Sequence, residues 1–218
     1  MKIRFLGHAA FLITTSDGIK ILTDPYEPGG FGGAIGYGPL KEAPDIVVIS
    51  HDHADHNYVK MAPGDPVVVR QPAPVTHRGV AFRSLATHHD SSKGAERGAN
   101  VVRVIEADGL RVCHLGDLGH TLAAEDAISL GAIDVLMIPV GGTFTIDARG
   151  ATAVVARLRP RIAIPMHFKT PKLGFKLLAV DDFLAGKASV RRVAGSEIEI
   201  TRDTLPEPTE IVVLEPAL

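Results

Sequence analysis

The sequence contains one cysteine, no tryptophan and only 5% aromatic residues among its 218 residues. Because the single cysteine, Cys113, has no intrachain partner, disulfides cannot stabilise the fold and a packed core must do so. Residues 1–11 contain no continuous apolar stretch of signal-peptide length, and no later segment reaches the roughly 20 apolar residues that cross a bilayer. These absences predict a cytoplasmic protein that has no membrane partner.

A strong charge of one sign is also absent. The 23 lysines and arginines nearly balance the 25 acidic residues, which leaves a formal net charge of -2. No global positive field would draw the chain onto nucleic acid, so nucleic acid is not an expected partner. Hydrophobic residues make up 45% of the chain, enough to bury a sizeable core. We expect residues 1–218 to form a single domain.

The first half of the chain consists of short β-branched segments separated by turn residues, a pattern typical of strands. Residues 45–50 (DIVVIS) are apolar without alternation, which predicts a strand covered on both faces. Helical spacing appears later, at residues 121–130 and 147–158. Two more apolar segments, 135–139 and 162–165, predict central strands. This order indicates an α/β fold of layered sheets with helices packed outside.

Nearly all of the ten histidines fall just beyond a predicted strand, where loops present functional groups on a rigid scaffold. The densest group is residues 51–56 (HDHADH), directly after the buried strand. Residues two apart in an extended backbone point the same way. His51 and His53 can therefore reach one metal ion, while Asp55 and His56 face another. An accidental polar surface loop would not explain the buried strand that precedes it.

This HxHxDH pattern resembles the metallo-β-lactamase superfamily and matches its motif at all four positions. The resemblance extends along most of the chain, because residues 87–90 (THHD), 115–117 (LGD) and 164–167 (IPMH) follow in the matching order. The resemblance implies a four-layer αββα sandwich, in which two mixed β-sheets are flanked by helices.

The resemblance also implies a site for two divalent metal ions. Carried over by position, the ligands of the first ion are His51, His53 and His89, those of the second are Asp55, His56 and His167, and Asp117 bridges the two. His88 and His89 leave a strand on opposite sides, so only one of them can point inward. The resemblance favours His89, because related sequences place the ligand before an aspartate.

Further segments are similar to compact hydrolases akin to the ascorbate-6-phosphate lactonases. Within that resemblance, which covers roughly residues 1–185, Asp24 supports a ligand histidine, unless it only caps a turn at a strand end. His8 and His120 are candidates for proton transfer or substrate contact, with purely structural roles as the alternative. The matching segments are 7–11 (GHAAF), 23–25 (TDP), 116–120 (GDLGH), 139–142 (PVGG) and 165–168 (PMHF).

Imidazole and carboxylate ligands suit Zn²⁺, our preferred metal, and also accept Mn²⁺, Fe²⁺ or Ni²⁺. Metal coordination can lower the pKa of water from about 16 to about 7 and so supply hydroxide at neutral pH. We therefore expect a metal-dependent hydrolase that cleaves a small, anionic ester, lactone or phosphoester, with Asp55 and Asp117 in catalytic roles. Arg97, Lys169 and Lys172 are either partners of a substrate anion or solvated surface charges.

Several other functions remain open from the sequence. A phosphodiesterase or nuclease would use the same dinuclear chemistry. An iron oxidoreductase would need an electron carrier, and no G-x-G-x-x-G fingerprint is present. A non-catalytic metal-binding protein would keep the ligands without the reaction. Only 51 residues follow His167, which favours a small-molecule substrate, and the residues do not decide whether the chain forms a homo-oligomer.

Overall fold

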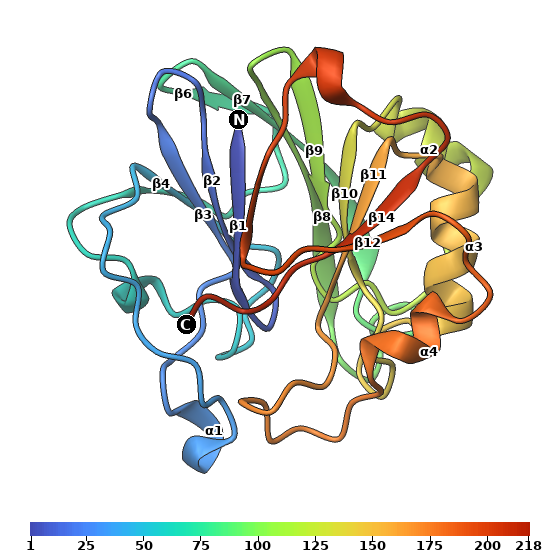
Figure 1. Ribbon diagram of the computed structural model, residues 1–218. Coiled ribbons are helices and arrows are strands. Elements are labelled where there is room, and N and C mark those ends of the chain that lie inside the picture. The colour runs from blue at the N-terminus through green and yellow to red at the C-terminus, as the bar shows by residue number, and fades with distance from the viewer.

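Two β-sheets form the centre of the computed structural model, which describes residues 1–218 (Figure 1). The six-stranded sheet has the order β13-β1-β2-β3-β4-β5. Its strands are β1 (Lys2–Gly7), β2 (Ala10–Thr14), β3 (Lys20–Thr23), β4 (Ile46–Val48), β5 (Val67–Val69) and β13 (Glu197–Glu199).

The eight-stranded sheet has the order β12-β14-β11-β10-β9-β8-β7-β6. Its strands are β6 (Val75–His77), β7 (Val80–His88), β8 (Ala99–Ala107), β9 (Leu110–His114), β10 (Val135–Pro139), β11 (Ile162–Met166), β12 (Val190–Arg192) and β14 (Glu210–Val213). Both sheets are mixed: β3, β4 and β5 run parallel, as do β9, β10 and β11, whereas β1 with β2 and β7 with β8 are antiparallel. The predicted pair of mixed sheets is confirmed.

Helices cover the outer face of the eight-stranded sheet (Figure 1). They are α2 (Ala124–Leu130), α3 (Ala148–Leu158) and α4 (Val180–Leu184). The prediction for α3 is confirmed, and its N-cap Asp147 accepts a hydrogen bond from the Gly150 amide at 2.8 Å. The prediction for α2 began too early. The Ala123 amide donates to the Asp126 carboxylate at 2.8 Å, a capping contact that starts the helix at Ala124.

The outer face of the six-stranded sheet is covered by loops and single turns instead of long helices. These segments include α1 (Gly30–Gly33) and the 3₁₀ turn η1 (Val59–Met61), while a second 3₁₀ turn, η2 (Arg202–Thr204), lies near the C-terminal end. Leu12, Leu22 and Val47 belong to a buried cluster with Tyr26 and Tyr37 from the loop around α1. Apolar side chains of that loop therefore do the covering that a helix would otherwise do.

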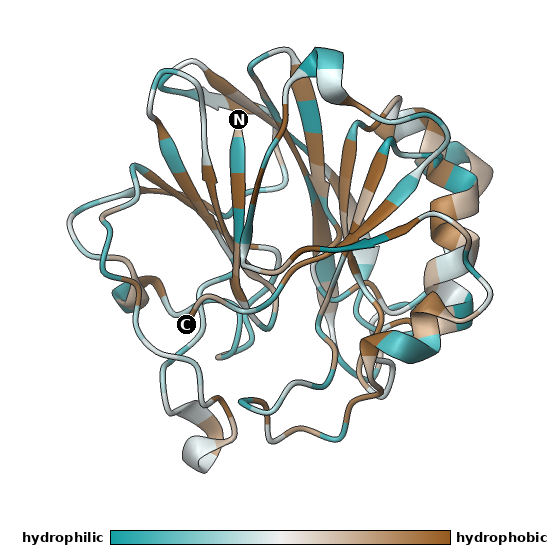
Figure 2. Ribbon diagram, viewed as in Figure 1, coloured by the Kyte–Doolittle hydropathy of each residue, from teal (hydrophilic) through white to brown (hydrophobic).

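The main core joins the two sheets and the helices. It contains Phe5 and Phe11 from the six-stranded sheet, Ile138 and Ile164 from the eight-stranded sheet, and Val154 from α3. Figure 2 shows the strands as predominantly hydrophobic and the connecting loops as more hydrophilic. None of the helices combines the length and hydrophobicity needed to cross a bilayer.

Candidate metal centre

The predicted ligands lie in loops that directly follow strands of both sheets. The chain leaves β4 into residues 51–56, β7 into His89, β9 into Asp117 and β11 into His167. His167 has a left-handed backbone with φ of 53°, a conformation that is uncommon outside glycine and concentrates at functional sites. Segments far apart in the sequence therefore place their polar side chains around one point.

The Asp117 carboxylate lies at the centre of this arrangement. Its Oδ2 atom is 3.0 Å from His89 Nε2, 3.3 Å from His56 Nε2, 3.3 Å from His167 Nε2 and 4.0 Å from His51 Nε2. Burial by itself would raise the pKa of Asp117, but the attraction of His167 and His56 holds it well below the ordinary value. Asp117 is therefore an anion placed among four imidazoles.

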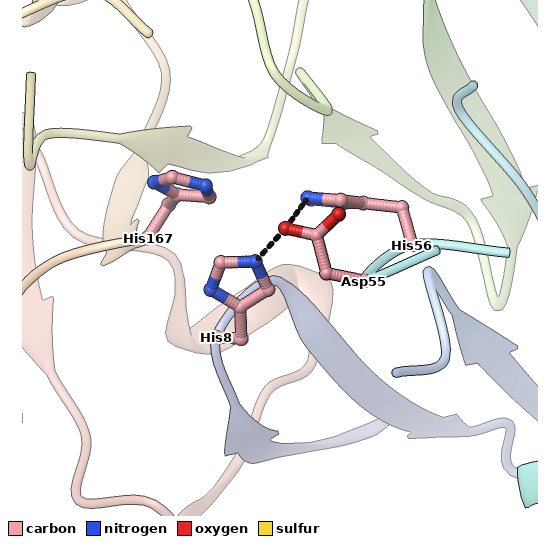
Figure 3. A group of neighbouring side chains, drawn as sticks. All are labelled: His8, Asp55, His56 and His167. Carbon is pink, nitrogen blue, oxygen red and sulfur yellow. Dashed lines mark hydrogen bonds and ion pairs between the residues drawn. The ribbon is translucent and has the colours of Figure 1, made fainter. Parts of the chain in front are cut away.

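Two separate groups of donors flank this carboxylate. In the first, the ligand atoms of His51, His53 and His89 lie within 4.8 Å of one another. In the second, the ligand atoms of His8, Asp55, His56 and His167 also lie within 4.8 Å of one another. Figure 3 shows how these four side chains lie.

Unpaired buried atoms test whether these residues fit metal ions. His56 Nε2 and Asp117 Oδ1 are both buried and have no hydrogen-bond partner. Leaving such a group unpaired costs about 1–3 kcal/mol, and a coordinated cation would remove that cost. The donors are imidazole nitrogens and carboxylate oxygens without thiolate, a set that suits zinc, manganese or iron. The residues therefore fit divalent metal ions.

Asp24 holds two of the histidines in orientation. Its Oδ2 atom accepts hydrogen bonds from His56 Nδ1 at 3.0 Å and from the Ser50 hydroxyl at 2.5 Å. Ser50 Oγ in turn accepts from His51 Nδ1 at 2.9 Å. Burial opposes ionisation of Asp24, but nearby His114 and His56 lower its pKa to about 2. The arrangement engages Nδ1 of both rings and turns their Nε2 atoms toward the other donors. His51 Nε2 lies 3.0 Å from His53 Nδ1, close enough for one cation to bind both atoms. The role of Ser50 was not predicted from the sequence.

Asn100 and Gly116 fix the position of Asp117. The Asp117 amide donates to Asn100 Oδ1 at 3.0 Å, and Asn100 Nδ2 donates to Thr87 Oγ1 and to the Leu115 carbonyl. Gly116 has φ of 55°, and a Cβ atom there would lie 2.4 Å from Asn100 Oδ1. Only glycine fits this turn, which explains the Gly-Asp pair. Asn100 lies on β8 away from every motif, so no local sequence signal indicated its role.

His89, and not His88, points toward Asp117. The His88 ring instead packs against His120, with ring centroids 5.8 Å apart. Asp90 accepts four backbone hydrogen bonds from the following loop, which ends at Arg97. The aspartate after His89 therefore shapes this loop, a role that gives the His-Asp pair a physical reason.

The structure does not bring His120 into the site. Its Nδ1 donates to the Thr121 carbonyl at 3.0 Å, and its Nε2 accepts from the His88 amide at 3.3 Å. His120 lies in a separate hollow beside Thr143 and Gly150. Because both ring nitrogens are engaged with the backbone, His120 has no free position for proton transfer.

His8 lies inside the centre but behind the cavity wall. It is 1% exposed, and its Nε2 donates to Asp55 Oδ2 at 3.0 Å (Figure 3). Burial and the neighbouring His167 lower the pKa of His8 to about 4, so the ring is neutral. His8 does not line the cavity, and its hydrogen bond orients Asp55. Of the roles considered from the sequence, which were proton transfer, substrate contact or a structural role, this placement fits the structural one. His114, buried beside Asp24, donates to the Ala9 carbonyl at 2.8 Å.

A cavity of about 570 Å³ opens onto the site. Of the three basic residues considered above, Arg97 lines it, whereas Lys169 donates to the Phe175 carbonyl at 3.3 Å and Lys172 to the Leu218 carbonyl at 2.8 Å. The lining residues are Phe31, Asp52, His53, Ala54, Asp55, His89, Arg97, Asp117, Phe144, His167 and Phe175.

Two sheets with histidine and carboxylate side chains gathered at one edge are the architecture of metallo-β-lactamase-type proteins. The sequence profile of the beta-lactamase superfamily domain matches residues 2–167. The chain belongs to this superfamily, as the motifs predicted.

Three similar proteins are consistent with this assignment. The UPF0173 metal-dependent hydrolase of Thermococcus kodakarensis is 31% identical over 197 residues, covering 78% of this chain and 85% of that protein. The crystal structure of a putative Zn-dependent hydrolase of the metallo-beta-lactamase superfamily from Thermotoga maritima is 37% identical, with a TM-score of 0.79 over 98% of both chains. Igni18, a metallo hydrolase from Ignicoccus hospitalis, shares the fold at 23% identity, with a TM-score of 0.65 over 92% of this chain and 99% of its own.

Proposed function

We propose that this protein is a metal-dependent hydrolase that uses two divalent metal ions, preferably zinc, to cleave a small, anionic ester, lactone or phosphoester. One observation carries the proposal: the Asp117 carboxylate lies between two groups of donors, each large enough for one ion. The proposed ligands are His51, His53 and His89 for one ion, Asp55, His56 and His167 for the other, and Asp117 for both.

The chemistry of such ions makes hydrolysis the natural reaction. When bound, they lower the pKa of water to about 7 and polarise a carbonyl or phosphoryl oxygen. The chain keeps the ligands in one orientation, because Asp24 and Ser50 hold His51 and His56 and because Asn100 holds Asp117. This preorganisation avoids rearrangement during the reaction.

Asp55 is suited to bind a metal ion and to orient the attacking water. Its carboxylate lines the cavity, and His8 orients it from behind. Burial would raise the pKa of Asp55, but the positive charge of His56 and the hydrogen bond from His8 lower it strongly. The group is therefore an anion at neutral pH, as a metal ligand must be, and it can orient the attacking water by accepting a hydrogen bond from it.

Arg97 supplies a positive charge at the cavity wall. Its guanidinium is 36% exposed and forms only a long contact with Glu96, at 3.6 Å. A planar guanidinium can bind a carboxylate or phosphate through two hydrogen bonds. Arg97 is thus the proposed partner of the substrate anion.

The names of two relatives also support the proposal. The Thermococcus protein is named a metal-dependent hydrolase, and the Thermotoga protein a putative Zn-dependent hydrolase.

Metal analysis followed by a substrate panel tests the proposal. We expect two ions per chain by plasma mass spectrometry, and zinc- or manganese-dependent turnover of a lactone, an aryl ester or an aryl phosphoester. Asp117→Asn should reduce kcat by at least about 100-fold, on the scale of losing a group that acts on the transition state. Asp203→Asn, an exposed aspartate of η2 that does not line the cavity, is the control. Turnover that persists in metal-free protein would contradict the proposal.

A further inference from the structure

Three phenylalanine side chains lie at the mouth of the metal-site cavity and are exposed to water, although phenylalanine is usually buried. Phe31 is 54% exposed, Phe144 is 38% exposed and Phe175 is half-buried, and all three line the cavity. The chain has eight phenylalanines, and each of the others is buried: Phe5, Phe11, Phe82, Phe168 and Phe183. Every phenylalanine that reaches solvent is therefore at this one opening.

The three rings form a continuous surface although they come from separate loops. The Phe175 ring centroid is 5.3 Å from that of Phe31 and 6.1 Å from that of Phe144. Phe175 also contacts the His8 ring edge-on, at 5.8 Å between centroids. Since His8 belongs to the second donor group, the aromatic surface adjoins that side of the metal centre.

Hydrogen bonds between two loops hold Phe31 in an unfavourable backbone conformation. Its backbone has φ of 53°, a left-handed conformation that is unfavourable for a bulky side chain. Main-chain hydrogen bonds tie its loop to the loop that carries Phe175: Gly36 donates to the Lys172 carbonyl at 2.7 Å, and Gly174 donates to the Ala34 carbonyl at 2.6 Å. Figure 1 shows α1 beside this second loop, drawn in orange. A strained, exposed aromatic residue held by neighbouring loops is typical of a binding surface.

The cavity therefore has a charged side and an apolar side. Arg97 also lines an adjoining hollow together with His51 and His53, which places its charge on the side of the first donor group. Apolar rings border the second group. A ligand that satisfies both sides has an anionic end and an apolar end, separated by the bond to be cleaved.

We propose that Phe31, Phe144 and Phe175 bind an apolar aryl or alkyl group of the substrate, so that the substrate is an amphiphilic ester or lactone and not a uniformly polar sugar derivative. This assignment rests on the proposed hydrolase function, since it places the apolar group next to the bond that would be cleaved. The rings contribute stacking and burial of apolar area.

A fluorescent reporter tests the aromatic surface without requiring turnover. Because the chain has no tryptophan, Phe144→Trp introduces a single reporter at the cavity. In the zinc-loaded protein, phenylacetate and acetate offer the same carboxylate and differ only in the ring. We expect phenylacetate to shift the emission at concentrations about tenfold lower than acetate, the value of burying one ring partly.

Matched variants of the reporter protein separate the surface from general effects. Phe31→Ser and Phe175→Leu should each remove most of the preference for phenylacetate, whereas Ile128→Ser, 80% exposed on α2, should leave it unchanged. Equal binding of the two acids would overturn the proposal. So would a Phe31→Ser variant that changes the sedimentation coefficient but not the preference, because the rings would then form a subunit interface.

A comparison of hydrolysis distinguishes this proposal from the function it rests on. We expect 4-nitrophenyl phenylacetate to have a higher kcat/KM than 4-nitrophenyl acetate, and Phe31→Ser to abolish the difference. A protein that binds phenylacetate selectively but cleaves no ester, lactone or phosphoester would support the aromatic surface and contradict the hydrolase. A protein that cleaves both esters equally would support the hydrolase and contradict the aromatic surface.

Discussion

At the scale of single residues, orientation of the histidines decides whether a cluster can bind metal. An imidazole offers its Nε2 lone pair only if the proton is on Nδ1, and Nδ1 keeps that proton when it has an acceptor. Asp24 provides this acceptor directly to His56 and through Ser50 to His51. One buried carboxylate therefore sets the tautomer of a ligand in each donor group.

Replacing Asp24 by asparagine should weaken metal binding without removing any ligand. An amide keeps the shape but loses the charge that stabilises the Nδ1–H groups, and loss of such a supporting group typically costs about 10–100-fold in metal affinity. Competition with a chromogenic chelator measures this loss. Asp45→Asn serves as control, because Asp45 also accepts a backbone hydrogen bond at a strand end but lies outside the metal centre. Unchanged zinc affinity in Asp24→Asn would show that Asp24 does not support the ligands.

At the scale of elements, a buried arginine joins the two sheets beside the site. Arg103 on β8 is 1% exposed and donates to the Ile49 carbonyl at 2.8 Å and to the Gln71 carbonyl at 2.7 Å. It also donates to the Arg70 carbonyl. Burial lowers the pKa of Arg103 to about 10, which still leaves it charged at neutral pH. The guanidinium therefore holds the ends of β4 and β5, the strands next to the histidine-rich loop, against β8.

Arg103→Met should destabilise the protein strongly. The substitution keeps much of the apolar volume but leaves several buried carbonyls without donors, and each lost hydrogen bond to a charged group is worth about 1.5–3 kcal/mol. We expect the free energy of unfolding in urea to fall by roughly 3 kcal/mol or more. Arg83→Met on neighbouring β7, 54% exposed and 3.6 Å from Glu106, should change it by less than about 1 kcal/mol. A similar small change in Arg103→Met would contradict the role described.

At the scale of the whole molecule, the metal centre connects the two sheets. His51, His53, Asp55 and His56 follow a strand of the six-stranded sheet, and His89, Asp117 and His167 follow strands of the eight-stranded sheet. Cations held by both sets would cross-link the halves of the sandwich. Without cations, buried polar atoms that lack a hydrogen-bond partner, such as His56 Nε2 and Asp117 Oδ1, remain at this junction.

Metal loading should therefore raise the thermal stability, and this gain should shrink as the pH falls. Zinc at 100 times its Kd stabilises the folded state by about 2.7 kcal/mol. Burial lowers the pKa of His56, but Asp117 and Asp55 raise it well above the ordinary value, so the metal-free site holds a proton there at neutral pH. Zinc must displace this proton, and binding weakens as protons become more abundant.

Calorimetric scans with and without zinc, between pH 8 and pH 6, measure this linkage. The difference in Tm should be largest at pH 8, and the zinc-free protein with added chelator provides the baseline. A difference in Tm that stays constant or grows toward pH 6 would contradict competition between zinc and protons.

The sequence by itself determined the buried strands, the superfamily and the candidate ligands, because continuous apolar patterns indicate burial and because HxHxDH is a local motif. Residues 45–50, 135–139 and 162–165 were predicted as buried strands, and they contain β4, β10 and β11. Contacts between distant segments were decided only by the tertiary structure. Nothing in the sequence pairs Asn100 with Asp117, sends His120 to the backbone or brings Phe31 beside Phe175, because such contacts depend on how loops from separate strands meet in space.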